Sequence, residues 1–183
     1  MVDPKNGTKR GKMNKINGKK SNKGFTLVEL IVVLVILAIL AAILVPALLG
    51  YIDSARNKQT LLNARSAMTA AQAELSAVYG ANTVSPNAIA TANDSHQKNL
   101  IATADLEKLT PACTIFEVAC KEDYDATKTR KEQHDAFTVY WVHYKDASAE
   151  VWYRGDTGEW SDTKVETTKQ IYKVYQASGS NGG

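Results

Sequence analysis

An uninterrupted apolar run near the N-terminus constrains this chain more than any other feature. Sixteen consecutive apolar residues extend from Leu30 to Val45, and the wider segment from Phe25 to Leu49 is interrupted only by Thr26, Glu29 and Pro46. A bilayer core requires about 20 apolar residues, so this segment is long enough to span a membrane as a helix. A carboxylate inside such a helix costs about 2.5–3.5 kcal/mol on insertion scales, which predicts a partner for Glu29.

The segment before the apolar run is strongly basic. Residues 1–24 carry eight Lys or Arg and a single acid, and show no apolar periodicity, which predicts disorder. By the positive-inside rule, this end stays in the cytoplasm and the C-terminus crosses the membrane. An ordinary secretory signal is cut after its apolar core, whereas here the small residue Gly24 precedes it. Cutting after Gly24 would remove the charges and leave the whole apolar helix on the mature protein.

These residues resemble the class III signal of type IV pilins and pseudopilins. Gly24 matches the glycine before the cut, Phe25 the new N-terminus, Glu29 the acid at the fifth mature position, and Pro46 a proline that many of these proteins share. The resemblance implies that a prepilin peptidase cleaves after Gly24 and N-methylates Phe25. It also implies that Glu29 pairs with the freed amine of Phe25, in its own or a neighbouring chain, during assembly. The alternative is that Glu29 only caps its own helix.

The basic character of the chain resides in the leader. The full sequence has a formal charge of +3, but without residues 1–24 it retains 14 basic and 18 acidic side chains, a charge of −4. Sequence-specific nucleic-acid binding would require a basic face on the mature domain, so we expect none. The roughly 100 residues after the helix suit one small domain.

Beyond the apolar run, the sequence predicts that the helix continues to Tyr79 and stops at Gly80. A helix over 25–79 would be roughly 80 Å long, of which 25–49 would serve for membrane insertion and polymerisation. Its second half carries one apolar stripe at alternating three- and four-residue steps, typical of an amphipathic helix: Leu61, Ala64, Met68, Ala71, Leu75 and Val78.

Pro46 and Gly50 lie between the two halves and predict a helix break. Proline lacks the amide donor and crowds the preceding turn, so we expect a kink or a locally unwound stretch over 42–50. Two interpretations of this break remain: a simple bend in the helix, or a stretch that melts during filament assembly. Only the second would have a function.

The remaining residues, 80–183, predict a globular head with an antiparallel sheet, and hence an α+β fold like that of type IV pilins. Residues 81–136 are expected to be mostly loop, with a short helix over 104–109, and the tail 178–183 to be disordered. Alternation and turn signals predict strands over Phe137–Tyr144, Ala149–Arg154 and Glu159–Ser161, and a strand or short helix within 164–176.

Two cysteines, Cys113 and Cys120, are separated by six residues. On this topology they lie outside the membrane, where a disulfide can persist. We expect a bridge between them, and two reduced thiols are the alternative. No zinc-like spacing accompanies them, so we expect no metal site.

Catalytic signatures are weak throughout. His96, His134 and His143 share no spacing, and we expect His143 to be a packed or edge histidine on its strand. The Asp123–Asp125–Thr127 pattern lacks the glycine and distal glutamate of a calcium loop. We therefore expect no enzyme and no cofactor. Core packing is expected for most of the aromatic residues, and a sugar- or DNA-binding platform is the alternative: Tyr140, Trp141, Tyr144, Trp152, Tyr153 and Trp160.

The sequence therefore favours a structural subunit that forms a helical homo-oligomer. The resemblance implies a prepilin peptidase, an assembly ATPase and a platform protein as partners. It places the precursor in the cytoplasmic membrane with its N-terminus inside, and the mature protein in a surface pilus. A pseudopilin of a type II secretion or DNA-uptake machine shares this N-terminus, and a membrane-tethered binding or enzymatic domain is the alternative of another class.

Overall fold

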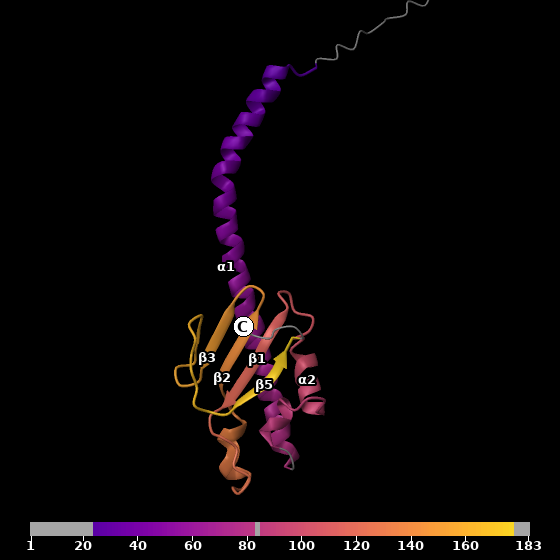
Figure 1. Ribbon diagram of the computed structural model, residues 1–183, viewed down its shortest axis with the longest axis vertical. Coiled ribbons are helices and arrows are strands. Elements are labelled where there is room, and N and C mark those ends of the chain that lie inside the picture. Colours follow the sequence, from indigo (N-terminus) through magenta and orange to yellow (C-terminus); the bar gives the residue numbers. More distant parts are fainter. Residues whose placement is uncertain (1–23, 83–84, 178–183) are drawn as a thin grey trace, which may run out of the picture. The chain divides into compact units, whose positions relative to one another are not determined.

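The described part of the chain comprises a long helix and a head that contains an antiparallel sheet (Figure 1). The structure, a computed structural model, describes residues 24–82 and 85–177. The chain divides into two compact units, Met1–Leu44 and Val45–Gly183, and the second unit holds the sheet. The leader up to residue 23 and the tail 178–183, both predicted to be disordered, lie outside the described residues.

The long helix, α1, spans Leu27–Ala81, close to the predicted 25–79. Every residue of α1 before Thr60 is exposed, whereas eight residues between Thr60 and Val78 are buried. This change follows the predicted transition from an all-round apolar segment to a single stripe. The buried stripe is broader than predicted, because it includes Thr60, Asn63 and two further alanines, while Leu61 and Met68 are only half-buried.

α1 remains helical through Pro46 and Gly50. The unwound stretch that we considered for 42–50 is therefore absent from this single chain. Proline deprives the helix of one backbone hydrogen bond, but the alanines and leucines around it are strong helix formers and keep theirs. Melting during filament assembly stays a prediction.

The C-terminal end of α1 differs from the prediction at Gly80. The helix continues through Gly80 to Ala81, and the next residue, Asn82, takes the left-handed conformation with φ 58°. Asparagine tolerates this conformation, so it can end a helix as glycine does. The Arg130 guanidinium reinforces the end, donating to the Val78 carbonyl at 3.3 Å and lying 4.7 Å from the ring centroid of Phe137.

The sheet has the strand order β4-β3-β2-β1-β5, with every neighbouring pair antiparallel. The predicted hairpin and third strand are confirmed with boundaries shifted by at most two residues, and the ambiguous 164–176 segment supplies a strand. The strands of the described chain are β1 (Cys113–Cys120), β2 (Val139–Asp146), β3 (Glu150–Arg154), β4 (Glu159–Ser161) and β5 (Ile171–Gln176).

The prediction for residues 81–136 was wrong in two respects. A helix, α2, spans Ser95–Thr103 and ends where the predicted 104–109 helix should begin. Asp94 caps it, because its Oδ1 accepts the His96 amide at 2.8 Å, and Asp105, with φ 51°, prevents continuation. The predicted loop also contains β1, which lies between β2 and β5, as Figure 1 shows.

The two cysteines occupy opposite ends of β1, which overturns the predicted disulfide. Both are free and buried. A strand rises about 3.3 Å per residue, so the ends of β1 lie roughly 23 Å apart, whereas bridged Cα atoms lie within about 7 Å. Burial, the largest influence, raises the pKa of each thiol to about 12. Cys113 and Cys120 therefore pack as small apolar side chains.

The main core lies between the buried stripe of α1 and one face of the sheet. Phe116 and Tyr144 are its largest fully buried side chains from the central strands, with ring centroids 6.3 Å apart. The alanines of α1 have small side chains that leave room for these rings. Gln72 fixes the helix to the start of β2 by accepting the Val139 amide at 2.8 Å and donating to the Phe137 carbonyl at 3.1 Å.

Candidate processing and assembly site

The predicted cleavage point lies just outside α1. Gly24, Phe25 and Thr26 are non-helical and exposed, and α1 begins at the next residue, Leu27. The Phe25 side chain is 79% exposed. The bond between Gly24 and Phe25 is thus an exposed, non-helical peptide bond, the form in which a protease can accommodate a substrate backbone.

Thr26 and Glu29 form a reciprocal capping arrangement at the start of α1. Glu29 Oε2 accepts the Thr26 amide at 2.8 Å and the Thr26 hydroxyl at 2.7 Å. The Glu29 amide in turn donates to Thr26 Oγ1 at 3.2 Å. This is a capping box, in which a threonine and a glutamate three residues apart satisfy the free donors of a helix start.

The capping box bears on the role predicted for Glu29. In the chain that still carries its leader, the carboxylate is held by Thr26, as in the local-capping alternative. Both of these bonds reach Oε2, which leaves Oε1 for another donor. The amine of Phe25 exists only after cleavage, so pairing between Glu29 and that amine stays a prediction. The contribution of Thr26 was missed, although the spacing Thr-x-x-Glu is itself a sequence signal for it.

The surface of α1 after the capping box is apolar. Large hydrophobic side chains are exposed from Leu27 to Ile52, and the most apolar window of α1 has no buried residue. Monomeric soluble proteins rarely expose so much contiguous apolar surface. α1 is long and apolar enough to cross a membrane, which is compatible with membrane anchoring.

One comparison with known proteins supports this interpretation of the N-terminus. Residues 19–45 match the family model of the prokaryotic N-terminal methylation motif. The motif indicates a type IV pilin-like or pseudopilin-like precursor, and it belongs to structural proteins and not to an enzyme family. Together with the long apolar helix and the antiparallel sheet, it fits type IV pilin-like proteins. No curated protein and no solved structure matches the chain.

A second cluster of ionisable side chains lies on the sheet face away from the main core. His143 on β2 bridges the neighbouring strands, with Nδ1 3.0 Å from Glu117 Oε2 on β1 and Nε2 2.7 Å from Glu150 Oε1 on β3. The imidazole stacks on Trp152, with ring centroids 5.2 Å apart and planes inclined by 3°. His143 is thus a packed histidine, as predicted.

This geometry favours the charged imidazolium. Burial of the ring is the largest influence and opposes the charge, but the hydrogen bonds and charges of Glu117 and Glu150 outweigh it and raise the pKa of His143. The hydrogen bond from His143 lowers the pKa of Glu117. For Glu150, burial again opposes the charge, and bonds from His143 and Lys145 outweigh it to lower the pKa. The two glutamates and the histidine therefore form a charged triad across three strands.

The other candidates from the sequence are not brought together. Asp125 Oδ1 accepts the amide and hydroxyl of Thr127, while Asp123 Oδ1 accepts the Gln170 amide. Of the aromatic residues, Tyr144 lies in the main core, and Trp141 and Trp152 form a small second core with Ala119. Within the described residues, no group of three or more His, Cys, Asp or Glu side chains is arranged so that it could hold a metal ion.

Proposed function

We propose that this chain is a structural subunit of a type IV pilus. It would polymerise through the apolar half of α1 after cleavage behind Gly24 and N-methylation of Phe25. One observation carries the proposal: the methylation motif at residues 19–45 covers the predicted cleavage point and the start of an exposed apolar helix, which is capped immediately after that point.

The geometry supports a simple order of events. The basic leader holds the precursor in the cytoplasmic membrane with its N-terminus inside, and the prepilin peptidase removes the leader while α1 stays in the bilayer. The positive charges of the leader hold the N-terminus of α1 on the cytoplasmic side. Once the leader is removed, α1 can leave the membrane and enter the filament. An assembly ATPase and a platform protein then move subunits into a filament, in which neighbouring apolar helices cover one another and the heads face outward.

Glu29 would guide each incoming subunit. Its carboxylate, one oxygen of which is not used by Thr26, would bind the methylated ammonium of Phe25 on a neighbouring chain. Such a charge-assisted hydrogen bond is strong in an apolar environment, and it relieves the cost of an unpaired carboxylate there. The same pairing would fix the axial register between subunits.

A pseudopilin of a secretion or DNA-uptake machine is the second candidate, because the methylation motif is common to both groups. The two functions differ in their product, since a pilin forms long surface filaments and a pseudopilin does not. Adhesion, motility and DNA uptake are all compatible roles for a pilus built from this subunit.

The test replaces Glu29 by alanine and compares it with Thr26→Val. Glu29→Ala removes both the cap and the carboxylate, whereas Thr26→Val removes the side-chain cap and leaves the carboxylate available to a neighbour. We expect both variants to be inserted and cleaved, but only Thr26→Val to form filaments on electron micrographs. Filaments of normal length and number from Glu29→Ala would contradict the proposed pairing.

A further inference from the structure

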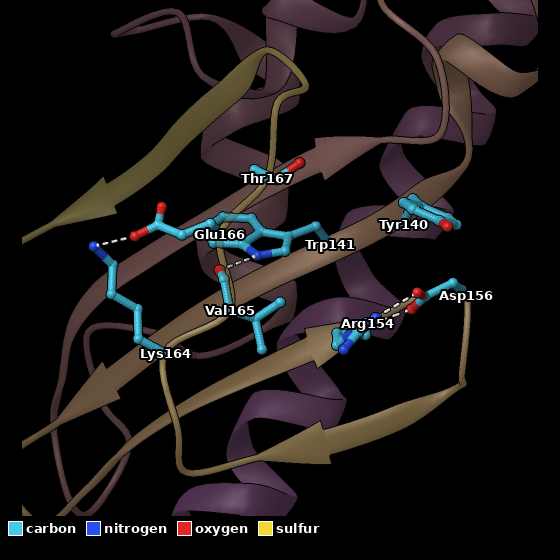
Figure 2. Close-up of a pocket in the computed structure, with 8 residues that line it drawn as sticks. All are labelled: Tyr140, Trp141, Arg154, Asp156, Lys164, Val165, Glu166 and Thr167. Atoms are coloured by element: carbon cyan, nitrogen blue, oxygen red, sulfur yellow. Dashed lines mark hydrogen bonds and ion pairs between the residues drawn. The ribbon is translucent and has the colours of Figure 1, made fainter.

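A polar pocket opens on the sheet face that carries Trp141, away from the main core. It has a volume of about 350 Å³ and lies between the ends of β2 and β3 and the segment that connects β4 to β5. This volume is at the lower end of the roughly 300–1,000 Å³ typical of small-ligand sites. Figure 2 shows the residues that line it, which include an aromatic ring and two pairs of opposite charges: Tyr140, Arg154 with Asp156, and Lys164 with Glu166.

The wall formed by the β4–β5 segment is fixed to the sheet. The indole Nε1 of Trp141 donates to the Val165 carbonyl at 2.8 Å, and the Trp141 side chain is buried. Val165 packs against the small core of Ala119, Trp141 and Trp152. Because the segment is anchored at its middle, Lys164 and Glu166 are held at the pocket rim.

Tyr140 provides an aromatic wall whose position depends on Gly155. The Gly155 amide donates to the Tyr140 carbonyl at 2.6 Å. A Cβ at position 155 would collide with Cδ2 of the Tyr140 ring and would lie 2.7 Å from the Tyr140 carbonyl oxygen. Only glycine allows this approach, so the ring rests against the backbone of residue 155. The Tyr140 hydroxyl makes no hydrogen bond within the part of the chain that the structure describes.

The charges that line the pocket are already paired. Arg154 donates to Asp156 through Nε at 3.1 Å and Nη2 at 2.6 Å, and Lys164 Nζ lies 2.6 Å from Glu166 Oε1. In Figure 2 these two ion pairs lie on either side of the Trp141 ring. The formal charge of the four groups sums to zero. A charged ligand would have to displace one partner of a pair, whereas a neutral ligand can use the remaining N–H groups and carboxylate lone pairs.

We propose that this pocket binds a neutral saccharide, one face of which packs on Tyr140 while its hydroxyls bind the Arg154–Asp156 and Lys164–Glu166 pairs. A sugar ring combines hydroxyls that both donate and accept with an apolar C–H face. This combination suits an aromatic wall flanked by paired charges. The proposal concerns the head alone, so it holds or fails independently of polymerisation.

The test presents the full chain to immobilised oligosaccharides. The protein is solubilised in a zwitterionic detergent, because a detergent with a sugar head group would compete for the pocket. The array carries neutral glycans of hexoses and N-acetylhexosamines beside sialylated and sulfated ones. We expect neutral glycans to bind and the best of them to be confirmed by saturation-transfer NMR. An array with no bound glycan, or with only acidic glycans bound, overturns the proposal.

Variants then locate the site. Tyr140→Ala should weaken binding about tenfold, which corresponds to about 1.4 kcal/mol, and Tyr140→Phe should retain most of the affinity by keeping the ring. Arg154→Gln should also weaken glycan binding. Because Arg154 is exposed, this variant is expected to fold, and it replaces Tyr140→Ala in the test if that variant does not fold. Tyr51→Ala is the matched control, because Tyr51 is 76% exposed on α1. Equal binding by Tyr140→Ala or Arg154→Gln, with an unchanged circular dichroism spectrum, would exclude this pocket.

Discussion

Replacing His143 by leucine should destabilise the head in a pH-dependent manner. His143 bridges Glu117 on β1 and Glu150 on β3, and its side chain is 12% exposed. Leucine fills a similar volume against Trp152 but cannot donate a hydrogen bond. Two carboxylates would then face one another across β2 without the positive charge between them.

The expected magnitude follows from the two bonds. A hydrogen bond to a charged group contributes about 1.5–3 kcal/mol. The bond from His143 to Glu150 should contribute less, because the Glu150 side chain is 34% exposed and Glu150 Oε2 also lies 3.3 Å from Lys145 Nζ. We therefore expect a loss of about 2–3 kcal/mol in the free energy of unfolding. For a unit of this size, each kcal/mol lost lowers Tm by about 4 °C, so we expect Tm to fall by about 8–12 °C.

The direction of the pH dependence follows from the pKa shifts. The pKa of His143 is raised above 6.5 by folding, so its contribution is complete below pH 6.5 and is lost as pH rises through the folded pKa. The pKa values of Glu117 and Glu150 are lowered below 4.5, so their contribution is present above pH 4.5 and is lost in more acidic solution. Lys173 faces Glu117, and Lys145 faces Glu150. The triad therefore stabilises the head most between about pH 4.5 and 6.5.

Thermal unfolding of the full chain in detergent, followed by near-ultraviolet circular dichroism, tests this reasoning at pH 6 and pH 9.5. The difference in Tm between the wild type and His143→Leu should be large at pH 6 and smaller at pH 9.5. The triple variant Glu117→Gln/His143→Leu/Glu150→Gln should recover most of the loss, because no unpaired charge remains. A gap that is equal at both pH values, or a triple variant as unstable as the single one, would refute the argument.

Three further predictions concern the head. Arg130→Gln should lower the free energy of unfolding by about 1–2 kcal/mol, since it removes the guanidinium from the end of α1 and from the Phe137 ring; an unchanged urea midpoint would count against this. Gly155→Ala should cost about 1–3 kcal/mol in the same assay, because its Cβ collides with Tyr140, and wild-type stability would show that the contact is easily relieved. Cys113 and Cys120 should resist iodoacetamide in the folded chain and react in urea, because both thiols are buried with raised pKa values; a mass increase of the unreduced chain on reduction would instead reveal a disulfide.

The elements that could be predicted from sequence are those with a strong local pattern. The apolar run determines the first half of α1, and the three- and four-residue spacing of Ala71, Leu75 and Val78 determines the buried stripe. The hairpin of β2 and β3 follows from aromatic and β-branched residues on both sides of a polar turn. In each case the local pattern and the tertiary environment require the same structure.

The errors arose where the pattern was ambiguous or depended on a distant partner. β1 contains Thr114, Ile115, Phe116 and Val118, which favour a strand, but the cysteines at its two ends suggest a disulfide-closed loop. Its place between β2 and β5 depends on pairing with residues far along the chain, which local reasoning does not reveal.

The same limit applies to the sites. The motif around Gly24 and Phe25 is local and could be recognised in the sequence. Neither the triad of Glu117, His143 and Glu150 nor the pocket beside Tyr140 could be predicted, because each is assembled from several strands or connecting segments.

The most direct test of the account is electron microscopy of surface filaments sheared from cells, combined with the N-terminal mass of their main protein band. We predict long, thin filaments whose subunit begins at N-methylated Phe25. A chain that retains its leader, or a correctly processed chain that forms no filaments, would contradict the assignment as a pilus subunit.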